Sequence, residues 1–331
     1  MDHRTLGRTG RTVSVIGLGT WQLGADWGDV SEDDARAVLE TSRRAGVTFF
    51  DTADVYGDGR SETMIGRWRS SLSDADRDAI TIATKIGRRA ALLPENYTAA
   101  NFRDWTDRSR TNLGMDTLDL VQLHCPPTAV YRSDATYDAL DGLVESGAIA
   151  AYGVSVETVD EALTAIARPH VATVQIVLNA FRLKPLDEVL PAARDAGVGI
   201  IARIPLASGL LTGRYRHDTA FAPDDHRTYN RHGEAFDAGE TFSGVDFDEG
   251  VEAAKEFSVL AEGAGLPPAR AAVAWVAQLP GVSTVIPGAR NPQQAEANAA
   301  AGSVAPLGDA FSEAVRELYD RRLRAAIHSR W

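Results

Sequence analysis

The sequence is poor in cysteine, in lysine and in long apolar runs. Cys125 is the single cysteine among 331 residues, which excludes a disulfide within the chain. The longest uninterrupted apolar stretch, residues 271–277, is far shorter than the ~20 residues of a membrane-spanning helix. Residues 1–4 are polar, and no apolar signal core follows them. We therefore expect a cytoplasmic protein that does not insert into a membrane.

Positive charge is scarce as well. The formal net charge is −12 and the isoelectric point about 5.1, which argues against nucleic acid as a partner because phosphate binding requires clustered Lys and Arg. Of the three lysines, Lys85, Lys184 and Lys255, Lys85 is the one that ends an apolar segment. Apolar residues make up 44% of the chain, enough for a large core. The composition is typical of a soluble globular protein and leaves the oligomeric state open.

Short apolar segments alternate with helical patterns along the chain, which indicates an α/β fold. We expect eight strands, at residues 15–17, 48–51, 80–86, 118–123, 151–154, 173–177, 199–202 and 283–286. Helical periodicity lies between them, at residues 32–45, 61–72, 99–113, 134–146, 158–167, 186–196, 268–278 and 293–301. Strands that alternate with helices form a parallel sheet, and eight such units without a break in composition predict one (β/α)8 TIM barrel over residues 1–331.

Three segments extend this plan. Residues 4–14 contain a Gly-rich turn between short strand-like pieces and predict an N-terminal β-hairpin. Residues 309–326 predict an extra C-terminal helix outside the barrel. Residues 208–247 are expected to form a long active-site loop, whose part at 216–244 is polar and lacks periodicity.

Four residues whose side chains can take part in catalysis lie at or just beyond the ends of predicted strands. Asp51, Lys85 and His124 each close an apolar segment, and Tyr56 follows Asp51 by five residues. In a barrel the C-terminal ends of the strands gather at one face, so we expect these four side chains to share a site. Taken singly, each has a structural explanation, such as packing, capping or a solvated strand end. It is their joint placement at neighbouring strands that points to catalysis.

Together these groups suit proton transfer to a carbonyl oxygen. A free tyrosine titrates at about 10, and the ammonium of Lys85 is expected to lower that pKa by stabilising the phenolate. Asp51 would hold Lys85 in place, and His124 would orient the oxygen of the substrate. No side chain supplies hydride, so a cofactor is expected to do so.

These residues and the motifs around them resemble the aldo-keto reductase superfamily, in its bacterial branch, over nearly the whole chain. No single motif is specific, but the ordered set is: residues 17–21 (GLGTW), 51–57 (DTADVYG), 83–85 (ATK), 119–124 (DLVQLH), 153–155 (GVS), 205–213 (PLASGLLTG) and 286–290 (IPGAR). The resemblance implies a barrel closed at its bottom by the hairpin, and NADPH/NADP bound without a Rossmann domain. In agreement, no complete G-x-G-x-x-G follows a predicted strand.

The resemblance also implies roles for individual residues. Tyr56 matches the proton donor, Lys85 and Asp51 the pair that lowers its pKa, and His124 the orienting residue. Arg290 suits a 2′-phosphate, because a guanidinium forks onto phosphate oxygens. The residues that match cofactor contacts are Gly19, Thr20, Asp51, Ser155, Gln175, Arg203, Pro205, Leu206, Ser208, Gly209, Arg214, Gly288, Arg290, Gln294 and Asn298.

Arg203 departs from the family pattern, since many relatives stack an aromatic ring on the nicotinamide at this position. A guanidinium plane can stack as well. Its positive charge would disfavour the oxidised, cationic ring, so we expect a bias toward NADPH over NADP⁺.

The substrate side of the mouth is expected to be lined by Trp21, Trp27, Tyr56 and His124, which fits a small, neutral carbonyl compound. Three histidines of the 208–247 loop lack a recognised spacing of metal ligands, so no metal is expected. The leading hypothesis is NADPH-dependent reduction of an aldehyde or ketone to an alcohol, with hydride from the nicotinamide C4 and a proton from Tyr56. Two alternatives stay open: an NAD(P)-dependent sugar or alcohol dehydrogenase, and an NADPH-sensing regulatory subunit.

Overall fold

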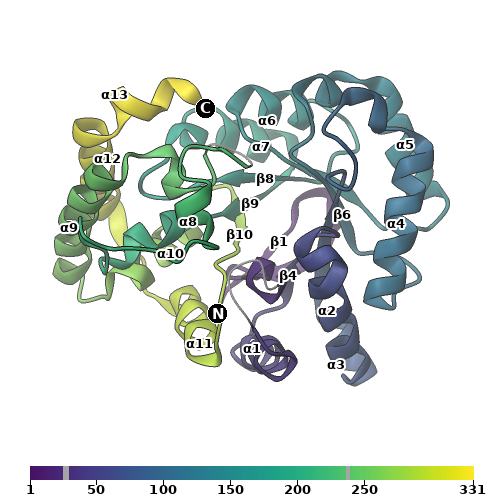
Figure 1. The fold of residues 1–331 in the computed structure, drawn as a ribbon, viewed down its shortest axis with the longest axis horizontal. Helices are drawn as coiled ribbons and strands as arrows, with labels where there is room; N and C mark the ends of the chain where they lie inside the picture. The colour runs from purple at the N-terminus through teal and green to yellow at the C-terminus, as the bar shows by residue number, and fades with distance from the viewer. Residues whose placement is uncertain (25–29, 236–238) are drawn as a thin grey trace.

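The computed structural model describes residues 1–24, 30–235 and 239–331 (Figure 1). Eight parallel strands lie side by side in chain order: β3 (Leu18–Gly19), β4 (Phe49–Asp51), β5 (Thr81–Ile86), β6 (Leu120–His124), β7 (Tyr152–Ser155), β8 (Thr173–Val177), β9 (Gly199–Arg203) and β10 (Val282–Val285). Parallel bridges between Ile16 and Val285 and between Gly19 and Gly288 join the first strand to the last. The predicted (β/α)8 barrel is confirmed.

A ring of helices surrounds the strands, and in Figure 1 it runs from α1 at the bottom through α4 and α5 at the right to α11 at the lower left. Its members are α1 (Glu32–Arg44), α2 (Arg60–Ser70), α4 (Ala99–Leu113), α5 (Asp134–Glu145), α6 (Val159–Ile166), α7 (Val189–Ala196), α10 (Pro268–Gln278) and α11 (Pro292–Ala299). Side-chain caps define several starts: the hydroxyls of Ser31, Thr98, Ser133 and Thr158 accept backbone N–H groups of the first turn. Gly114 and Gly197 end α4 and α7 in the left-handed conformation.

The strands are buried on both faces, as expected for a parallel sheet covered by helices. Every residue of β5, β8 and β9 is buried. A large apolar layer lies between sheet and helices. A second, smaller cluster consists of Leu6, Val13, Phe49, Ala83, Leu120, Ile201 and Ile286.

The predicted hairpin is present and supplies two members of that smaller cluster, Leu6 and Val13. Strand β1 (His3–Thr5) pairs antiparallel with β2 (Thr12–Ser14). Its turn docks against the start of β9, where a Cβ on Gly7 would lie 2.1 Å from the Gly199 nitrogen. The hairpin therefore packs at the N-terminal ends of the strands, away from the face where Asp51, Lys85 and His124 lie.

The structure differs from the prediction at several boundaries. The first strand is Leu18–Gly19, with the expected segment 15–17 reduced to the bridge at Ile16, because only isolated pairing with β10 is made there. The predicted C-terminal helix is divided into α12 (Gly308–Arg322) and α13 (Arg324–Ile327). The helices α3 (Asp74–Asp78) and α9 (Phe247–Gly263) are present in addition to those predicted. The buried Phe247, Val251, Ala254, Phe257 and Ala261 of α9 follow a helical spacing that the sequence already contains.

The segment 208–247 is less irregular than its composition indicates. It contains most of η7 (Ala207–Thr212), the single helical turn α8 (His226–Tyr229) and η8 (Phe242–Gly244). Phe221, Phe242 and Phe247 pack with ring centroids 5.1–5.9 Å apart, so an aromatic cluster holds the segment. In the described parts of the chain, no helix combines the length and apolarity that crossing a bilayer requires.

Candidate active site

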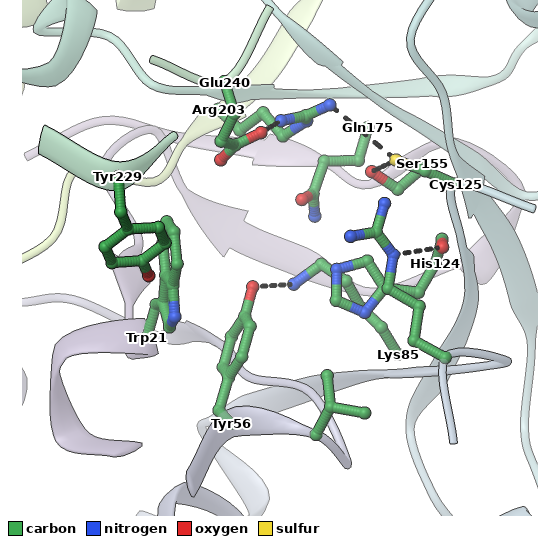
Figure 2. Close-up of a pocket in the computed structure, with 12 residues that line it drawn as sticks. Trp21, Tyr56, Lys85, His124, Cys125, Ser155, Gln175, Arg203, Tyr229 and Glu240 are labelled. Carbon is green, nitrogen blue, oxygen red and sulfur yellow. Dashed lines mark hydrogen bonds and ion pairs between the residues drawn. The ribbon is translucent and has the colours of Figure 1, made fainter. Parts of the chain in front are cut away.

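Three of the four predicted catalytic residues lie at the carboxyl ends of adjacent strands. Asp51 ends β4, Lys85 is the penultimate residue of β5, and His124 ends β6. Tyr56 begins η3 (Tyr56–Gly59), on the loop that follows β4. The structure thus brings all four together, and Figure 2 shows Tyr56, Lys85 and His124 around a common space.

A buried ion pair anchors the group. The ammonium of Lys85 contacts a carboxylate oxygen of Asp51, and both side chains are almost fully buried. Lys85 Nζ also donates to the Thr52 carbonyl at 2.9 Å and lies 3.5 Å from the Tyr56 hydroxyl. The second Asp51 oxygen accepts hydrogen bonds from the side-chain amides of Gln122, at 3.0 Å, and Gln175, at 2.8 Å. Each charge in this low-dielectric site therefore has a partner, as burial requires.

Burial and charge act against each other on Tyr56. Burial raises the pKa of its hydroxyl, Lys85 lowers it, and the net pKa lies above the ordinary value of 10.0. The expected lowering by Lys85 is present, but the expectation that the pKa as a whole is lowered is wrong, because desolvation outweighs the ammonium. For Lys85 itself, burial lowers the pKa, but Asp51 and Tyr56 outweigh it and raise the pKa above its ordinary value. Lys85 is therefore charged and Tyr56 protonated at neutral pH.

His124 is held neutral. Burial lowers its pKa well below the ordinary 6.5, and the nearby positive charges of Arg88, Lys85 and Arg203 lower it further. No described residue is a hydrogen-bond partner of its buried Nδ1 atom. Arg88, which sequence reasoning did not single out, donates from Nε to the His124 carbonyl at 2.9 Å and lines the same cavity.

Two adjacent cavities, which share part of their lining, lie beside Tyr56. The smaller, of about 330 Å³, is lined by Tyr56, Lys85, His124 and residues around them, and the larger groove has about 510 Å³. Both volumes fall in or near the range of small-molecule sites. Both cavities are lined by Trp21, Tyr56, Gln175, Arg203 and Glu240. Tyr56 therefore lies at the junction of the two cavities.

The residues predicted to contact a cofactor gather along the groove. Lining it are Gly19, Thr20, Asp51, Gln175, Arg203, Pro205, Leu206, Ser208, Gly209, Arg214, Gly288, Arg290, Gln294 and Asn298. Ser155 lies instead in the smaller cavity. At one end of the groove, the Arg290 N–H donates to Gln294 at 2.9 Å, and the Asn298 amide donates to the Gly288 carbonyl at 3.0 Å. Strand ends far apart in the sequence thus form one continuous wall.

Arg203 does not carry an isolated positive charge. Its guanidinium is paired with Glu157, at 2.5 Å, and with Glu240 of the 208–247 segment. It also lies 3.7 Å from the sulfur of Cys125. Two carboxylates outweigh one guanidinium, so the electrostatic reason for a bias against a cationic ring is removed.

The 208–247 segment contributes residues that sequence reasoning missed. His226 and Arg227 of α8 line the groove, and Tyr229 lines the smaller cavity beside Trp21 (Figure 2). The Trp21 ring stacks on Tyr56 at a centroid distance of 6.1 Å and contacts His226 at 5.5 Å. Of the four residues predicted on the substrate side, Trp27 lies outside the described residues. The unusual length of the segment was the signal that it reaches the mouth, but its polarity gave no indication of which side chains do so.

Comparison with known proteins identifies the family of the chain. Residues 15–320 match the model of the Aldo/keto reductase family. A curated relative, aldo-keto reductase YhdN of Bacillus subtilis, is 29% identical over 299 residues, covering 90% of this chain and 87% of the relative.

Two solved structures resemble the whole chain. The glycerol dehydrogenase AKR11B4 of Gluconobacter oxydans is 27% identical, with a TM-score of 0.78 and coverage of 97% of this chain and 96% of the other. An aldo-keto reductase of Klebsiella pneumoniae, solved in complex with NADPH, shares the fold at 24% identity, with a TM-score of 0.70 and 96% of each chain covered. The chain belongs to the aldo/keto reductase family and is an oxidoreductase.

Proposed function

We propose that this protein reduces a small aldehyde or ketone to an alcohol with NADPH as the hydride donor. The observation that carries the proposal is the position of the Tyr56 hydroxyl, 3.5 Å from Lys85 Nζ, at the junction of the two cavities that Tyr56 lines. A proton donor at such a junction can reach a substrate oxygen while a bound dinucleotide faces the substrate carbon.

The groove fits NADPH. Arg290, Gln294 and Asn298 at one end suit an adenosine 2′-phosphate, because guanidinium and amide groups bind phosphate and ribose oxygens. Gln175, which lines both cavities, and Ser155, which lines the smaller one, offer an amide and a hydroxyl for the nicotinamide carboxamide. When bound, the cofactor supplies the hydride that no side chain of this chain provides.

The four central residues, Asp51, Tyr56, Lys85 and His124, have separate roles in protonating the substrate oxygen. Tyr56 holds its proton at neutral pH and gives it to the developing alkoxide. The Lys85 ammonium stabilises the phenolate that is left, and Asp51 keeps that ammonium charged and in place. His124, held neutral by burial, hydrogen-bonds the substrate oxygen and orients it without adding a second charge. Trp21 and Tyr229 supply apolar walls for the substrate.

A carbonyl panel with NADPH tests the proposal. Tyr56→Phe is expected to lower kcat about 10²–10⁴-fold, the usual contribution of a positioned acid, while the Kd for NADPH changes little. Tyr137→Phe is the matched control, because it also removes a hydroxyl hydrogen bond, to the Tyr131 carbonyl at 3.1 Å, but in a helix of the outer ring. Full turnover by Tyr56→Phe would contradict the mechanism. Tight NADPH binding without any turnover would indicate a cofactor-sensing protein instead.

A second candidate is oxidation of a polyol or other alcohol with NADP⁺. The similarity to a glycerol dehydrogenase over almost the whole chain favours it, and so does the pairing of Arg203 with two carboxylates, which leaves no net positive charge against an oxidised ring. The ratio of forward to reverse kcat/KM at neutral pH separates the two candidates. A ratio in favour of alcohol oxidation would replace the reductase proposal.

A further inference from the structure

Two buried carboxyl groups flank Tyr56 in the chain. Asp54 precedes Tyr56 by two residues, and Glu62 lies in the first turn of α2. Both are 0% exposed. Neither lines the two cavities of the candidate active site, so the reaction described above leaves both groups without a role.

The two groups differ in their partners. Glu62 accepts hydrogen bonds from the Thr84 hydroxyl at 2.6 Å and from the Asn112 amide at 2.9 Å. For Asp54, neither carboxylate oxygen has a hydrogen-bond partner among the described residues. The Glu62 carboxylate therefore has two hydrogen-bond donors, whereas the Asp54 carboxylate has none among the described residues.

The nearest positive charges are engaged elsewhere. Arg89 and Arg108 donate to the backbone carbonyl of Asp54, at 3.4 and 3.2 Å, and both pair with the exposed carboxylate of Asp58. They bind the loop without binding the Asp54 side chain. An ionised Asp54 would then be a buried negative charge without a hydrogen-bond donor, an arrangement that proteins avoid by keeping the carboxyl protonated.

Charge neutralisation by a proton fits better than neutralisation by a metal. Within the described residues, no third His, Cys, Asp or Glu joins the pair to form a cation site. Burial, and then the charge of Glu62, raise the pKa of Asp54 to about 7, although the charges of Arg89 and Arg108 lower it. Burial raises the pKa of Tyr97 to about 12, and the negative charge of Asp54 contributes to this rise. Asp54 consequently changes charge at neutral pH.

The loop that follows Asp54 has a strained backbone conformation. Gly57, Asp58 and Gly59 have φ values of 57°, 52° and 92°, in the left-handed region. A Cβ on Gly57 would lie 2.1 Å from the Gly24 carbonyl oxygen, so the loop is also tightly packed. Such backbone persists only where its surroundings hold it, here the two arginines that bind the Asp54 carbonyl and the Asp58 carboxylate.

We propose that Asp54 is a positioning residue for Tyr56: a proton held by Asp54 against Glu62 keeps residues 54–59 in the conformation that presents the Tyr56 hydroxyl to Lys85. Loss of this proton on the alkaline side creates repulsion between the two carboxylates and displaces the loop. The inference rests on the proposed function, because it concerns the placement of the proposed proton donor.

The pH profile of kcat tests it with Asp54→Asn, which keeps the shape of a protonated aspartate but does not ionise. The wild-type kcat is expected to fall as the pH rises above about 7, while Asp54→Asn stays within about twofold of the acid-side value across the same range. Asp119→Asn is the matched control, because Asp119 is also a buried aspartate, paired with Arg11 in the hairpin region, and it should keep the wild-type profile. Superimposable profiles for wild type and Asp54→Asn would overturn the inference.

A second readout does not depend on turnover. The ring ¹³C resonances of Tyr56, assigned with Tyr56→Phe, are expected to shift with a midpoint near 7 in the wild-type protein and to lose that transition in Asp54→Asn. If the protein turns over no carbonyl compound, the proposed function fails, and this titration still decides the inference. If turnover is normal and the Tyr56 resonances show no transition that depends on Asp54, the inference fails alone.

Discussion

At the scale of single residues, the site depends on which groups hold protons when they are buried. Loss of water raises the pKa of Tyr56 and lowers that of His124, whereas for Lys85 burial is outweighed by Asp51 and Tyr56, which raise the pKa. The outcome is a protonated phenol, a charged ammonium and a neutral imidazole. Because these three states persist at neutral pH, the site contains a proton donor and one fixed positive charge to stabilise the resulting anion.

Asp54 leads to a prediction about stability that is independent of catalysis. Its pKa is raised to about 7 in the folded protein, above the ~3.9 of an unfolded chain, so the folded state binds more protons between these values. The free energy of unfolding is therefore expected to fall as pH rises from about 4 to about 7, by an amount on the order of 4 kcal/mol for this group. Urea unfolding at the two ends of this range measures it. Asp54→Asn should remove most of this decrease, and an unchanged slope would contradict the assignment.

At the scale of elements, the 208–247 segment acts on the barrel through a charge. Glu240 of this segment pairs with Arg203 at the end of β9, where Glu157 is the other partner. Glu240→Gln leaves one carboxylate for one guanidinium, so the local charge becomes more positive. We expect NADP⁺ to lose about tenfold in affinity relative to NADPH, as one charge at this range produces. Fluorescence titration of both cofactors measures the ratio.

The exposed Glu234→Gln, in the same segment, is the control for that experiment. This substitution removes the same charge from the chain, but Glu234 makes no hydrogen bond or ion pair with Arg203 among the described residues. It should therefore leave the ratio of the two affinities unchanged. An equal effect of both substitutions would show that net charge, and not the pairing with Arg203, is responsible.

The hairpin offers a second prediction at this scale. Gly7 and Gly10 both have positive φ, but a Cβ on Gly7 would lie 2.1 Å from the backbone of Gly199, whereas one on Gly10 would meet nothing within 4 Å. Gly10→Ala should cost only the conformational strain, about 1 kcal/mol. Gly7→Ala should cost several times more, on the order of 3 kcal/mol, because the hairpin must move off the barrel. Thermal unfolding compares them, and equal losses would contradict this docking geometry.

At the scale of the whole molecule, the end of the chain is connected to the active site through buried contacts. The Trp331 ring lies 3.7 Å from the guanidinium of Arg182, which is fully buried and donates to the backbone of Glu157 at 2.5 Å. Glu157 in turn pairs with Arg203. A Cβ on Gly239 or on Gly244 would lie 2.8 or 2.6 Å from the Trp331 ring, so this ring also supports the 208–247 segment.

Trp331→Ala is therefore expected to weaken cofactor binding without removing any group that lines the groove. We expect the Kd for NADPH to rise about threefold to tenfold, equivalent to about 1 kcal/mol, because the loss of a cation–π contact loosens Arg182 and the segment above it. The ring-preserving Trp331→Phe should retain most of the affinity. Calorimetric titration of both variants and of the wild-type protein measures the difference. A Kd of Trp331→Ala equal to that of the wild-type protein would show that the contact does not support cofactor binding.

Much of the fold follows from local pattern. Eight apolar segments with helical periodicity between them predict the barrel, because parallel strands covered on both faces must be apolar throughout. The same pattern predicts that Asp51, Lys85 and His124 meet, since strand ends of a barrel share one face. Helix α9 was also encoded by the spacing of Phe247, Val251, Ala254, Phe257 and Ala261, although its polar neighbours concealed it.

The sequence by itself determined that the residues closing the strands reach the mouth of the barrel, because the position and the end of each strand are set by local pattern. Only the tertiary structure decided their electrostatic states, because these depend on groups far apart along the chain. Arg203 meets Glu157 and Glu240, 46 and 37 residues away, and loses its isolated charge. Tyr56 and Asp54 hold their protons because helices and loops from several units exclude water from them, and no spacing in the sequence reports that exclusion.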